Sequence, residues 1–216
     1  GTTLRRTWVV GLTQSGETAD TLAALKRAKQ LGGRTLAITN VVGSSVTRVA
    51  HQCLYTRAGP EIGVAATKSF ITQLISLYLL ALSWTKTDAK TQHSLVQELS
   101  RLPSKVQRIL NDQACLASQG AYLSQFNSVF FVGRGVNYPV ALEGARKLKE
   151  ISYIHAEGYA AGELKHGPFA LLTPQTPVVA IVGADSTRLA TLANLREIKA
   201  RESPLIALTD ETDKDV

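Results

Sequence analysis

Glu143, Lys147 and Glu150 are spaced in a way that could support proton-transfer chemistry. They are four and three residues apart, so they share one face if residues 138–152 form a helix. A polar, glycine-containing stretch, "YAAGELKHGP", follows and places His166 just beyond that helix. A carboxylate, a lysine and a histidine can together move protons near neutral pH and stabilise a developing negative charge. A solvated salt-bridge ladder on an exposed helix has the same spacing, and that interpretation stays open.

This set of side chains meets the demands of moving a carbonyl between adjacent carbons. One base must carry a proton between the two carbons, a second acid–base group must serve the oxygen-bound protons, and a cation or donor must stabilise the developing oxyanion. The other histidines and loop glutamates are expected to be structural. His51 ends a short predicted helix, and His93 lies on a predicted helical connector. His155 is expected to order the loop, and Glu157 and Glu163 to cap or pair within it.

A second polar group lies where a strand-like run becomes helix-like. Thr13 ends "TWVVGLT", and Gln14, Ser15 and Thr18 follow it around Gly16. Ligands of open α/β sheets bind at this place, and the free N–H groups and positive end of a helix attract anions. A helix N-cap needs only one such residue, so the pattern favours a phosphate site. The chain lacks the nucleotide-binding motifs GxxxxGK(S/T) and GxGxxG, which favours a phosphorylated metabolite over a nucleotide as the ligand.

The elements that would position both groups alternate between strand and helix. Short apolar runs predict strands, namely "TWVVGLT", "RTLAITN", "CLYTR", "SVFFVGRG", "TPVVAIVGA" and "PLIALTD". Amphipathic or long apolar stretches predict the helices between them, among them "ADTLAALKRAKQLGG", "SSVTRVAHQ", "FITQLISLYLLALSW", "NYPVALEGARKLKEIS" and "DSTRLATLANLREIKARE". This alternation predicts an α/β fold with parallel sheets.

We expect three segments along the chain. Residues 1–85 form a first α/β domain that lacks its N-terminal part, and residues 126–216 form a second that lacks its C-terminal part. Residues 86–125 carry no strand pattern and read as a helical connector, in which Pro103 begins or kinks a helix. The chain has no methionine and begins at Gly1, so we expect it to be a piece of a longer protein.

Composition narrows the class of partner. The net charge is +7, but the basic residues are scattered, which fits a small anionic ligand and gives no reason to expect nucleic acid. Cys53 and Cys115 form no CxxC motif, so we expect no disulfide or zinc site, and a reducing, cytoplasmic location. The longest apolar stretch is interrupted by polar residues, and no signal peptide precedes it, so no membrane span is expected.

The motifs "SGETADT", "NVVGSS", "AGPEIGVAATK" and "LEGARKLKEISYIHAEGYAAGELKHGP" occur in this order. Together they resemble the isomerase half of the glutamine–fructose-6-phosphate aminotransferase family, which is built of two sugar-isomerase (SIS) domains. The resemblance covers essentially the whole chain and implies two flavodoxin-like, three-layer αβα units, both truncated. It also implies a phosphate site at Thr13, Gln14, Ser15 and Thr18. The family usually has serine at position 13, and threonine keeps the hydroxyl.

The same resemblance implies roles for four further residues. Glu150 would be the base that moves a proton between C1 and C2, His166 would assist ring opening, and Lys147 would serve hydroxyl protons or polarise the carbonyl. The main chain around Val64 would border the C1–C2 end of the sugar. The family's "VAST" reads "VAAT" here, so a serine side-chain contact at Ala66 is lost.

The resemblance implies conversion of fructose 6-phosphate and glutamine-derived ammonia to glucosamine 6-phosphate, a step toward UDP-N-acetylglucosamine, with no metal or organic cofactor. It implies a glutaminase domain in the parent chain, and Gly1 cannot serve as the nucleophile of that domain. It also implies a C-terminal lysine that forms a Schiff base. It further implies a homodimer in which His166 reaches the neighbouring site. The fragment alone would then bind sugar phosphate with little turnover. Two alternatives stay open, a non-catalytic sugar-phosphate sensor and a stand-alone SIS isomerase or deaminase.

Overall fold

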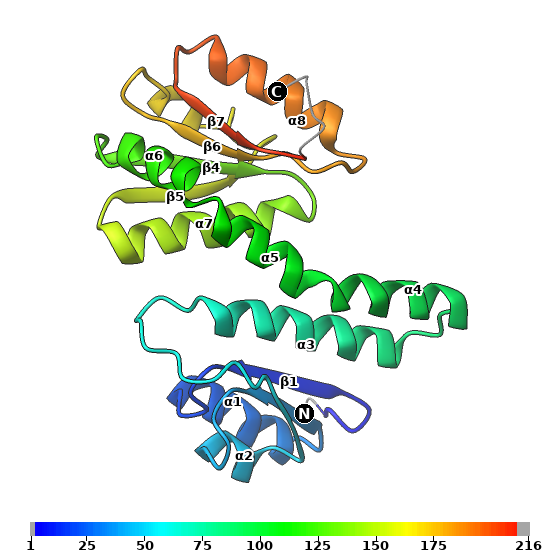
Figure 1. The fold of residues 1–216 in the computed structure, drawn as a ribbon. Coiled ribbons are helices and arrows are strands. Elements are labelled where there is room, and N and C mark those ends of the chain that lie inside the picture. Colours follow the sequence, from blue (N-terminus) through cyan, green and yellow to red (C-terminus); the bar gives the residue numbers. More distant parts are fainter. Residues whose placement is uncertain (1–2, 211–216) are drawn as a thin grey trace. The chain divides into compact units, whose positions relative to one another are not determined.

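The computed structural model of the protein describes residues 3–210 and divides into two units, Gly1–Arg108 and Ile109–Val216. The first unit is built on a parallel sheet with strand order β1-β2-β3. Its strands and helices are, in chain order, β1 (Trp8–Thr13), α1 (Ala19–Gln30), β2 (Arg34–Thr39), α2 (Ser45–Val49), β3 (Gln52–Tyr55) and α3 (Lys68–Trp84). Within this unit, α1 and α2 cover one face of the sheet and α3 the other (Figure 1).

The centre of the first unit is apolar on β2 and on the inner side of α1. Leu36, Ala37 and Ile38 are at most 3% exposed, as expected for a strand covered on both faces. Gly11 on β1 lets α1 approach closely, because a Cβ there would lie 2.8 Å from Cδ1 of Leu25. The predicted α/β class with parallel strands is confirmed.

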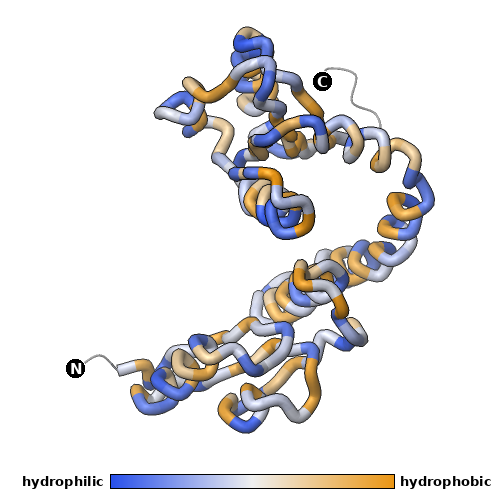
Figure 2. The backbone as a smooth tube through the Cα atoms, turned by 90° about the vertical axis from the view of Figure 1, so that its left-hand side faces the viewer, coloured by the Kyte–Doolittle hydropathy of each residue, from blue (hydrophilic) through white to orange (hydrophobic). Residues whose placement is uncertain are grey.

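Three further helices follow α3, namely α4 (Ala89–Ser100), α5 (Leu102–Asn111) and α6 (Gln113–Leu123). Asp88 caps α4 by accepting a hydrogen bond of 2.9 Å from the N–H of Thr91. Pro103 is the second residue of α5, where a missing N–H costs nothing, so it lies in the first turn of a new helix. Hydrophobic and hydrophilic residues alternate along these helices (Figure 2). The predicted division at residues 86–125 stays a prediction.

The second unit has a parallel sheet of order β5-β4-β6-β7. Its elements are β4 (Ser128–Gly133), α7 (Asn137–Ser152), β5 (His155–Ala160), the 3-10 helix η1 (Pro168–Leu171), β6 (Val178–Ile181), α8 (Arg188–Lys199) and β7 (Leu205–Leu208). Helix α7 covers one face of the sheet and α8 the other (Figure 1). Alternate residues of β4 serve the two sides: Val129 and Phe131 pack with the α7 layer, and Phe130 and Val132 with the α8 layer.

Strand β5 is an element that the sequence reasoning missed. His155 and Glu157 were expected in a loop, and the structure places both on β5, the edge strand beside β4. The hexapeptide "HAEGYA" contains no β-branched residue and only one aromatic, so its strand character comes from pairing with β4. Gly158 makes room for α7, since a Cβ there would lie 2.8 Å from Cα of Leu142. The sequence ending "YAAGELKHGP" therefore starts inside a strand.

Cys53 is half-buried on β3 and Cys115 is exposed on α6, and the two form no disulfide with each other. Burial raises the pKa of the Cys53 thiol. No helix within residues 3–210 is long and apolar enough to cross a membrane. Over the same residues, no three His, Cys, Asp or Glu side chains gather in a way that could hold a metal ion.

Candidate functional site

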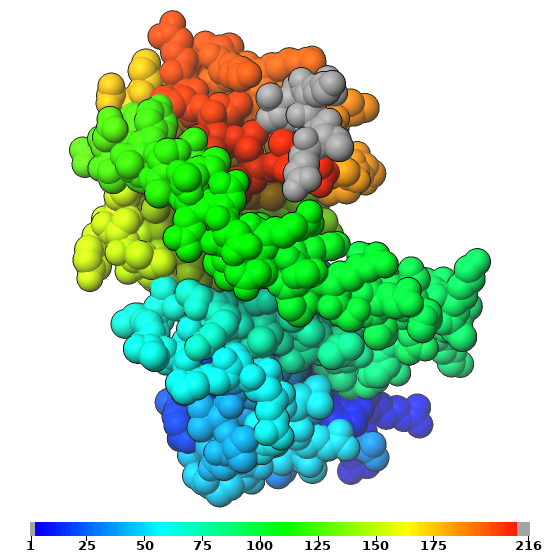
Figure 3. Space-filling view, in the orientation of Figure 1, coloured from blue at the N-terminus to red at the C-terminus, as the bar shows by residue number. Residues whose placement is uncertain are grey.

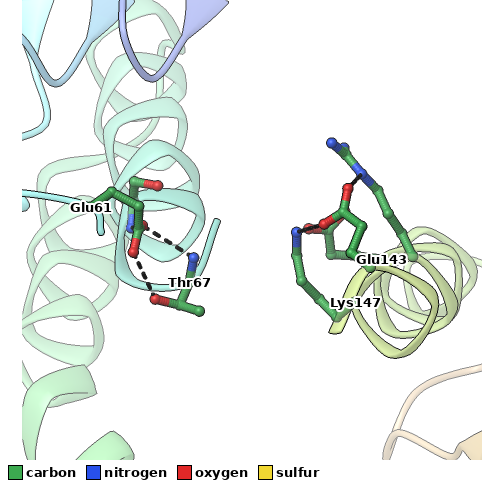
Figure 4. A network of polar contacts seen from close by, with 7 residues as sticks. Glu61, Thr67, Glu143 and Lys147 are labelled. Atoms are coloured by element: carbon green, nitrogen blue, oxygen red, sulfur yellow. Dashed lines mark hydrogen bonds and ion pairs between the residues drawn. The ribbon is translucent and has the colours of Figure 1, made fainter. Parts of the chain in front are cut away.

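Helix α7 carries a partly buried cluster of charges in the second unit. Nζ of Lys147 lies 3.0 Å from Oε1 of Glu143 and 3.1 Å from Oε2 of Glu150, so the predicted common face is confirmed (Figure 4). The side chains of Glu143, Lys147 and Glu150 are 19%, 21% and 28% exposed. Nε of Arg146 lies 3.0 Å from the second oxygen of Glu150, and this arginine is far more exposed. Lys147 thus lies between the carboxylates of Glu143 and Glu150 and contacts both.

The electrostatics of this cluster keep Glu150 ionised. Hydrogen bonds from Arg146 and then Lys147 lower the pKa of Glu150 below its usual value. The same contact raises the pKa of Arg146. An ionised carboxylate can accept a proton, and a neighbouring ammonium can stabilise an oxyanion. The cluster can therefore perform both halves of a proton-transfer step.

His166 lies on the loop that follows β5. Its N–H donates to the carbonyl of Glu163 at 3.0 Å, and Glu163 in turn donates its N–H to Ala160 at 2.8 Å. Leu164 anchors the loop in the core and is 2% exposed. Within residues 3–210 the imidazole of His166 makes no hydrogen bond or ion pair, so the structure does not join it to Glu150. The side chain is exposed and available.

The predicted phosphate loop connects β1 to α1 in the first unit. Oγ1 of buried Thr13 accepts a hydrogen bond of 3.1 Å from the N–H of Gly16 and lies 3.2 Å from Oγ1 of Thr18. Oγ of Ser15 accepts one of 3.2 Å from the N–H of Glu17. Thr18 is the N-cap residue of α1, yet its hydroxyl makes no capping hydrogen bond. Capping therefore does not account for these hydroxyls, and the first N–H groups of α1 remain without a side-chain partner from Thr18.

A second loop, after β2, supports the first. The carboxylate of Glu17 accepts a hydrogen bond of 2.7 Å from the N–H of Ser45, and the carbonyl of Gly16 accepts one of 2.9 Å from Val46. The hydrogen bond from Ser45 lowers the pKa of Glu17. Gly16 has φ of 75°, and a Cβ there would lie 2.1 Å from Oγ of Ser44. Sequence reasoning assigned no role to Glu17 or Ser44, although the quoted stretch "NVVGSS" contains the partner serines.

The segment before α3 presents a different arrangement. Glu61 accepts hydrogen bonds from the N–H of Ser69 at 2.9 Å and from the N–H and hydroxyl of Thr67 at 3.1 and 2.9 Å (Figure 4). These hydrogen bonds from Ser69 and Thr67 lower the pKa of Glu61 to about 2. Val64 is fully exposed, and the segment that leads into α3 lies on the visible surface (Figure 3, cyan). Glu61 therefore closes a loop that displays Val64, a role that sequence reasoning missed.

The sequence pattern of the SIS domain matches residues 3–83 and 122–216. The glutamine–fructose-6-phosphate aminotransferase (isomerizing) of Methanosarcina acetivorans is 51% identical over 214 residues, which are 97% of this chain and 35% of that protein. That of Thermococcus kodakarensis is 49% identical over 209 residues, 95% of this chain and 35% of its own length.

Solved structures agree with the sequence match. The C-terminal domain of the glucosamine–fructose-6-phosphate aminotransferase of Francisella tularensis superposes with a TM-score of 0.94 at 40% identity, covering 98% of this chain and 61% of that one. A glucosamine-6-phosphate deaminase of Thermotoga maritima, 23% identical, has a TM-score of 0.78 over 98% of this chain and 63% of its own, and shares the fold. The chain spans about a third of the curated relatives that it matches, at 35% of their length. On the domain match, this chain belongs to the SIS-domain family.

Proposed function

We propose that this chain provides the sugar-phosphate binding and isomerase chemistry of a glutamine–fructose-6-phosphate aminotransferase. The reaction would convert fructose 6-phosphate and glutamine-derived ammonia to glucosamine 6-phosphate. The names of relatives at 45–51% identity support the substrate. The observation that carries the chemistry is the partly buried contact of Lys147 with Glu150, which pairs an ionised carboxylate with an ammonium on one helix face.

The phosphate would bind at Thr13, Gln14, Ser15 and Thr18. The hydroxyls of Thr13 and Thr18 lie together, and Thr18 stands at the N-terminus of α1 without capping it. The positive end of α1 and its free N–H groups favour an anion there. The positive φ of Gly16 turns the main chain tightly enough to hold these groups in one loop.

Glu150 would take the proton from C1 of the open-chain sugar and return it to C2, so that no net proton is consumed. As the C1–H bond breaks, the electron pair passes to the carbonyl oxygen at C2, and Lys147 would stabilise that oxyanion. With an imine at C2, the electron pair would neutralise the protonated nitrogen instead. When C2 takes up the proton, the C1 hydroxyl gives its proton to the oxygen or nitrogen at C2 and becomes the C1 carbonyl. His166 would move the proton that ring opening requires, and the exposed main chain at Val64 would border the C1–C2 end. These assignments rest on the resemblance and on the geometry of α7.

The partners and location belong to the same proposal. A glutaminase domain in the full-length protein would supply ammonia, and a second copy of the chain would receive His166 in its site. The protein would act in the cytoplasm without a metal or organic cofactor. A non-catalytic sugar-phosphate sensor would share the Thr13–Thr18 loop and would have no use for Glu150 and His166 together.

The test is exchange of the C1 proton of fructose 6-phosphate with deuterated solvent, measured in the full-length protein. We expect Glu150→Gln to slow exchange by about 100-fold or more while binding of the sugar phosphate persists, since general bases contribute this much. Glu98→Gln removes a carboxylate of an exposed ion-pair group on α4 and should leave exchange unchanged. Binding without exchange in the unmodified protein would favour the sensor instead.

A further inference from the structure

A continuous polar connection runs from the loop after β4, through α8, to the loop after β5. Nη1 of Arg134 donates to Oδ1 of Asn194 at 2.9 Å, and Nδ2 of Asn194 donates to Oε2 of Glu197 at 3.3 Å. The other oxygen of Glu197 lies 2.7 Å from Nζ of Lys165. Asn194 is 7% exposed, and Arg134 and Glu197 supply the hydrogen-bond partners that its buried amide needs. Helix α8 thereby joins two loops at the carboxyl edge of the sheet.

The second of these loops carries His166. Lys165 directly precedes that histidine, so its contact with Glu197 links the loop to α8 one residue away from His166. At the other end of the loop, Gly162 lies against the guanidinium of Arg134, because a Cβ there would approach Nη1 to 3.0 Å. Arg134 and Lys165, the two ends of the connection, therefore lie against or within the same loop, the one that carries His166.

This connection has little to do with folding stability. The side chains of Lys165 and Glu197 are 51% and 37% exposed, and ion pairs between exposed groups contribute little to stability. The hydrophobic packing of the loop is supplied by Leu164 and Leu172 in the core. What the ion pair adds is a link between the loop and α8, while the imidazole of His166 has no partner of its own among the described residues.

We infer that Glu197 and Asn194 are positioning residues for His166, acting through Lys165 and Arg134. The inference rests on the proposed function, in which His166 assists ring opening. Helix α8 then takes part in one step of the reaction, although none of its residues is placed against the sugar. Hydrogen bonds from Lys165 and Asn194 lower the pKa of Glu197, which keeps it ionised for this contact.

Ring opening can be separated from the later proton transfer by the choice of substrate. In cyclic fructose 6-phosphate, C2 is bonded to the C5 oxygen. Opening breaks that bond, delivers a proton to the C5 oxygen and removes one from the C2 hydroxyl, leaving a C2 carbonyl. 5-Deoxyfructose 6-phosphate lacks the C5 oxygen and stays open. Its C1 proton can therefore be exchanged by Glu150 without help from His166.

The experiment compares C1 exchange of both substrates in the full-length protein and in Glu197→Gln. We expect the variant to lose about 3–5-fold in kcat with fructose 6-phosphate at little change in KM, since an exposed ion pair contributes up to about 1 kcal/mol, and to keep its rate with the open-chain analogue. The swapped pair, Lys165→Glu with Glu197→Lys, should recover most of the loss because it restores the ion pair. Glu98→Gln, which breaks an ion-pair group on α4, is the matched control.

Two results would overturn the inference while leaving the proposed function intact. One is an unchanged rate of Glu197→Gln on fructose 6-phosphate. The other is an equal loss on both substrates that the swapped pair does not recover, since a general structural role predicts this outcome. If the unmodified protein exchanges neither substrate, the proposed function fails and the inference fails with it.

Discussion

The two candidate regions differ in whether the main chain or charged side chains form them. The loop after β1 is shaped by the main chain, with a positive φ at Gly16 and neutral hydroxyls of Thr13 and Thr18 that lie 3.2 Å apart. The cluster on α7 is shaped by charged side chains, with Lys147 between Glu143 and Glu150. A main-chain site should fail when its backbone is strained, and a side-chain site when its charges change. Each region can therefore be broken by a change that the other would tolerate.

Lys147→Met should give the largest effect, because it removes the charge that would stabilise the enediolate and keeps the volume. We expect kcat for C1 proton exchange to fall by about 100–1000-fold, as when one oxyanion donor is lost. Lys147 also lowers the pKa of Glu150, so the acidic limb of the pH–rate profile should move to higher pH.

Arg146→Gln is the control that separates these two effects. Arg146 is exposed and also lowers the pKa of Glu150, so this variant should shift the acidic limb and retain most of kcat. An equal loss of kcat in both variants would contradict a special role for Lys147. Neither variant should weaken phosphate binding, which we assign to the loop after β1.

Gly16→Val should break the loop after β1. A valine must adopt φ of 75° and place its Cβ 2.1 Å from Oγ of Ser44, so we expect a loss of about 2–3 kcal/mol in the free energy of unfolding. Urea unfolding and titration with fructose 6-phosphate measure the two consequences. Gly43→Val is a matched control, because Gly43 shares the positive φ of 77° and has no atom within 4 Å of a built Cβ. Equal losses in both variants would show that crowding at Ser44 is unimportant.

Removing hydroxyls should have a smaller effect than deforming the main chain. Ser15→Ala together with Thr18→Val should weaken fructose 6-phosphate binding by about 1–3 kcal/mol, the cost of losing hydrogen bonds to a charged group. The free energy of unfolding should fall by about 1–2 kcal/mol, because the variant also loses the contact of Thr18 with Thr13 and the hydrogen bond from Glu17 to Ser15. At saturating substrate, kcat should stay near that of the unmodified protein, since the α7 cluster is intact. An unchanged affinity would remove the phosphate assignment from this loop.

The same contrast explains which features the sequence could predict. Spacing within one helix predicted the contacts of Lys147, and apolar runs predicted strands such as β2 and β4, because both depend on neighbouring residues. Contacts between distant segments escaped prediction. Glu17 meets Ser45 across 28 residues, and β5 owes its strand to pairing with β4. The freedom of His166 and the connection through α8 likewise appear only once the loops are placed side by side.

Glu61→Gln tests the loop that displays Val64, with the smallest expected effect. The folded-state pKa of Glu61 is about 2, below the unfolded value, so its carboxylate stabilises the fold above the unfolded pKa and loses this contribution as pH falls toward 2. The difference in unfolding free energy between Glu61→Gln and the unmodified protein should therefore be full at pH 7 and shrink in acid. Asp88→Asn alters a comparable carboxylate cap on α4. Its difference in unfolding free energy from the unmodified protein should also shrink in acid, and KM for fructose 6-phosphate should not change. A raised KM in Glu61→Gln alone would tie this loop to the sugar, whereas equal KM values would leave Glu61 a cap of α3 and nothing more.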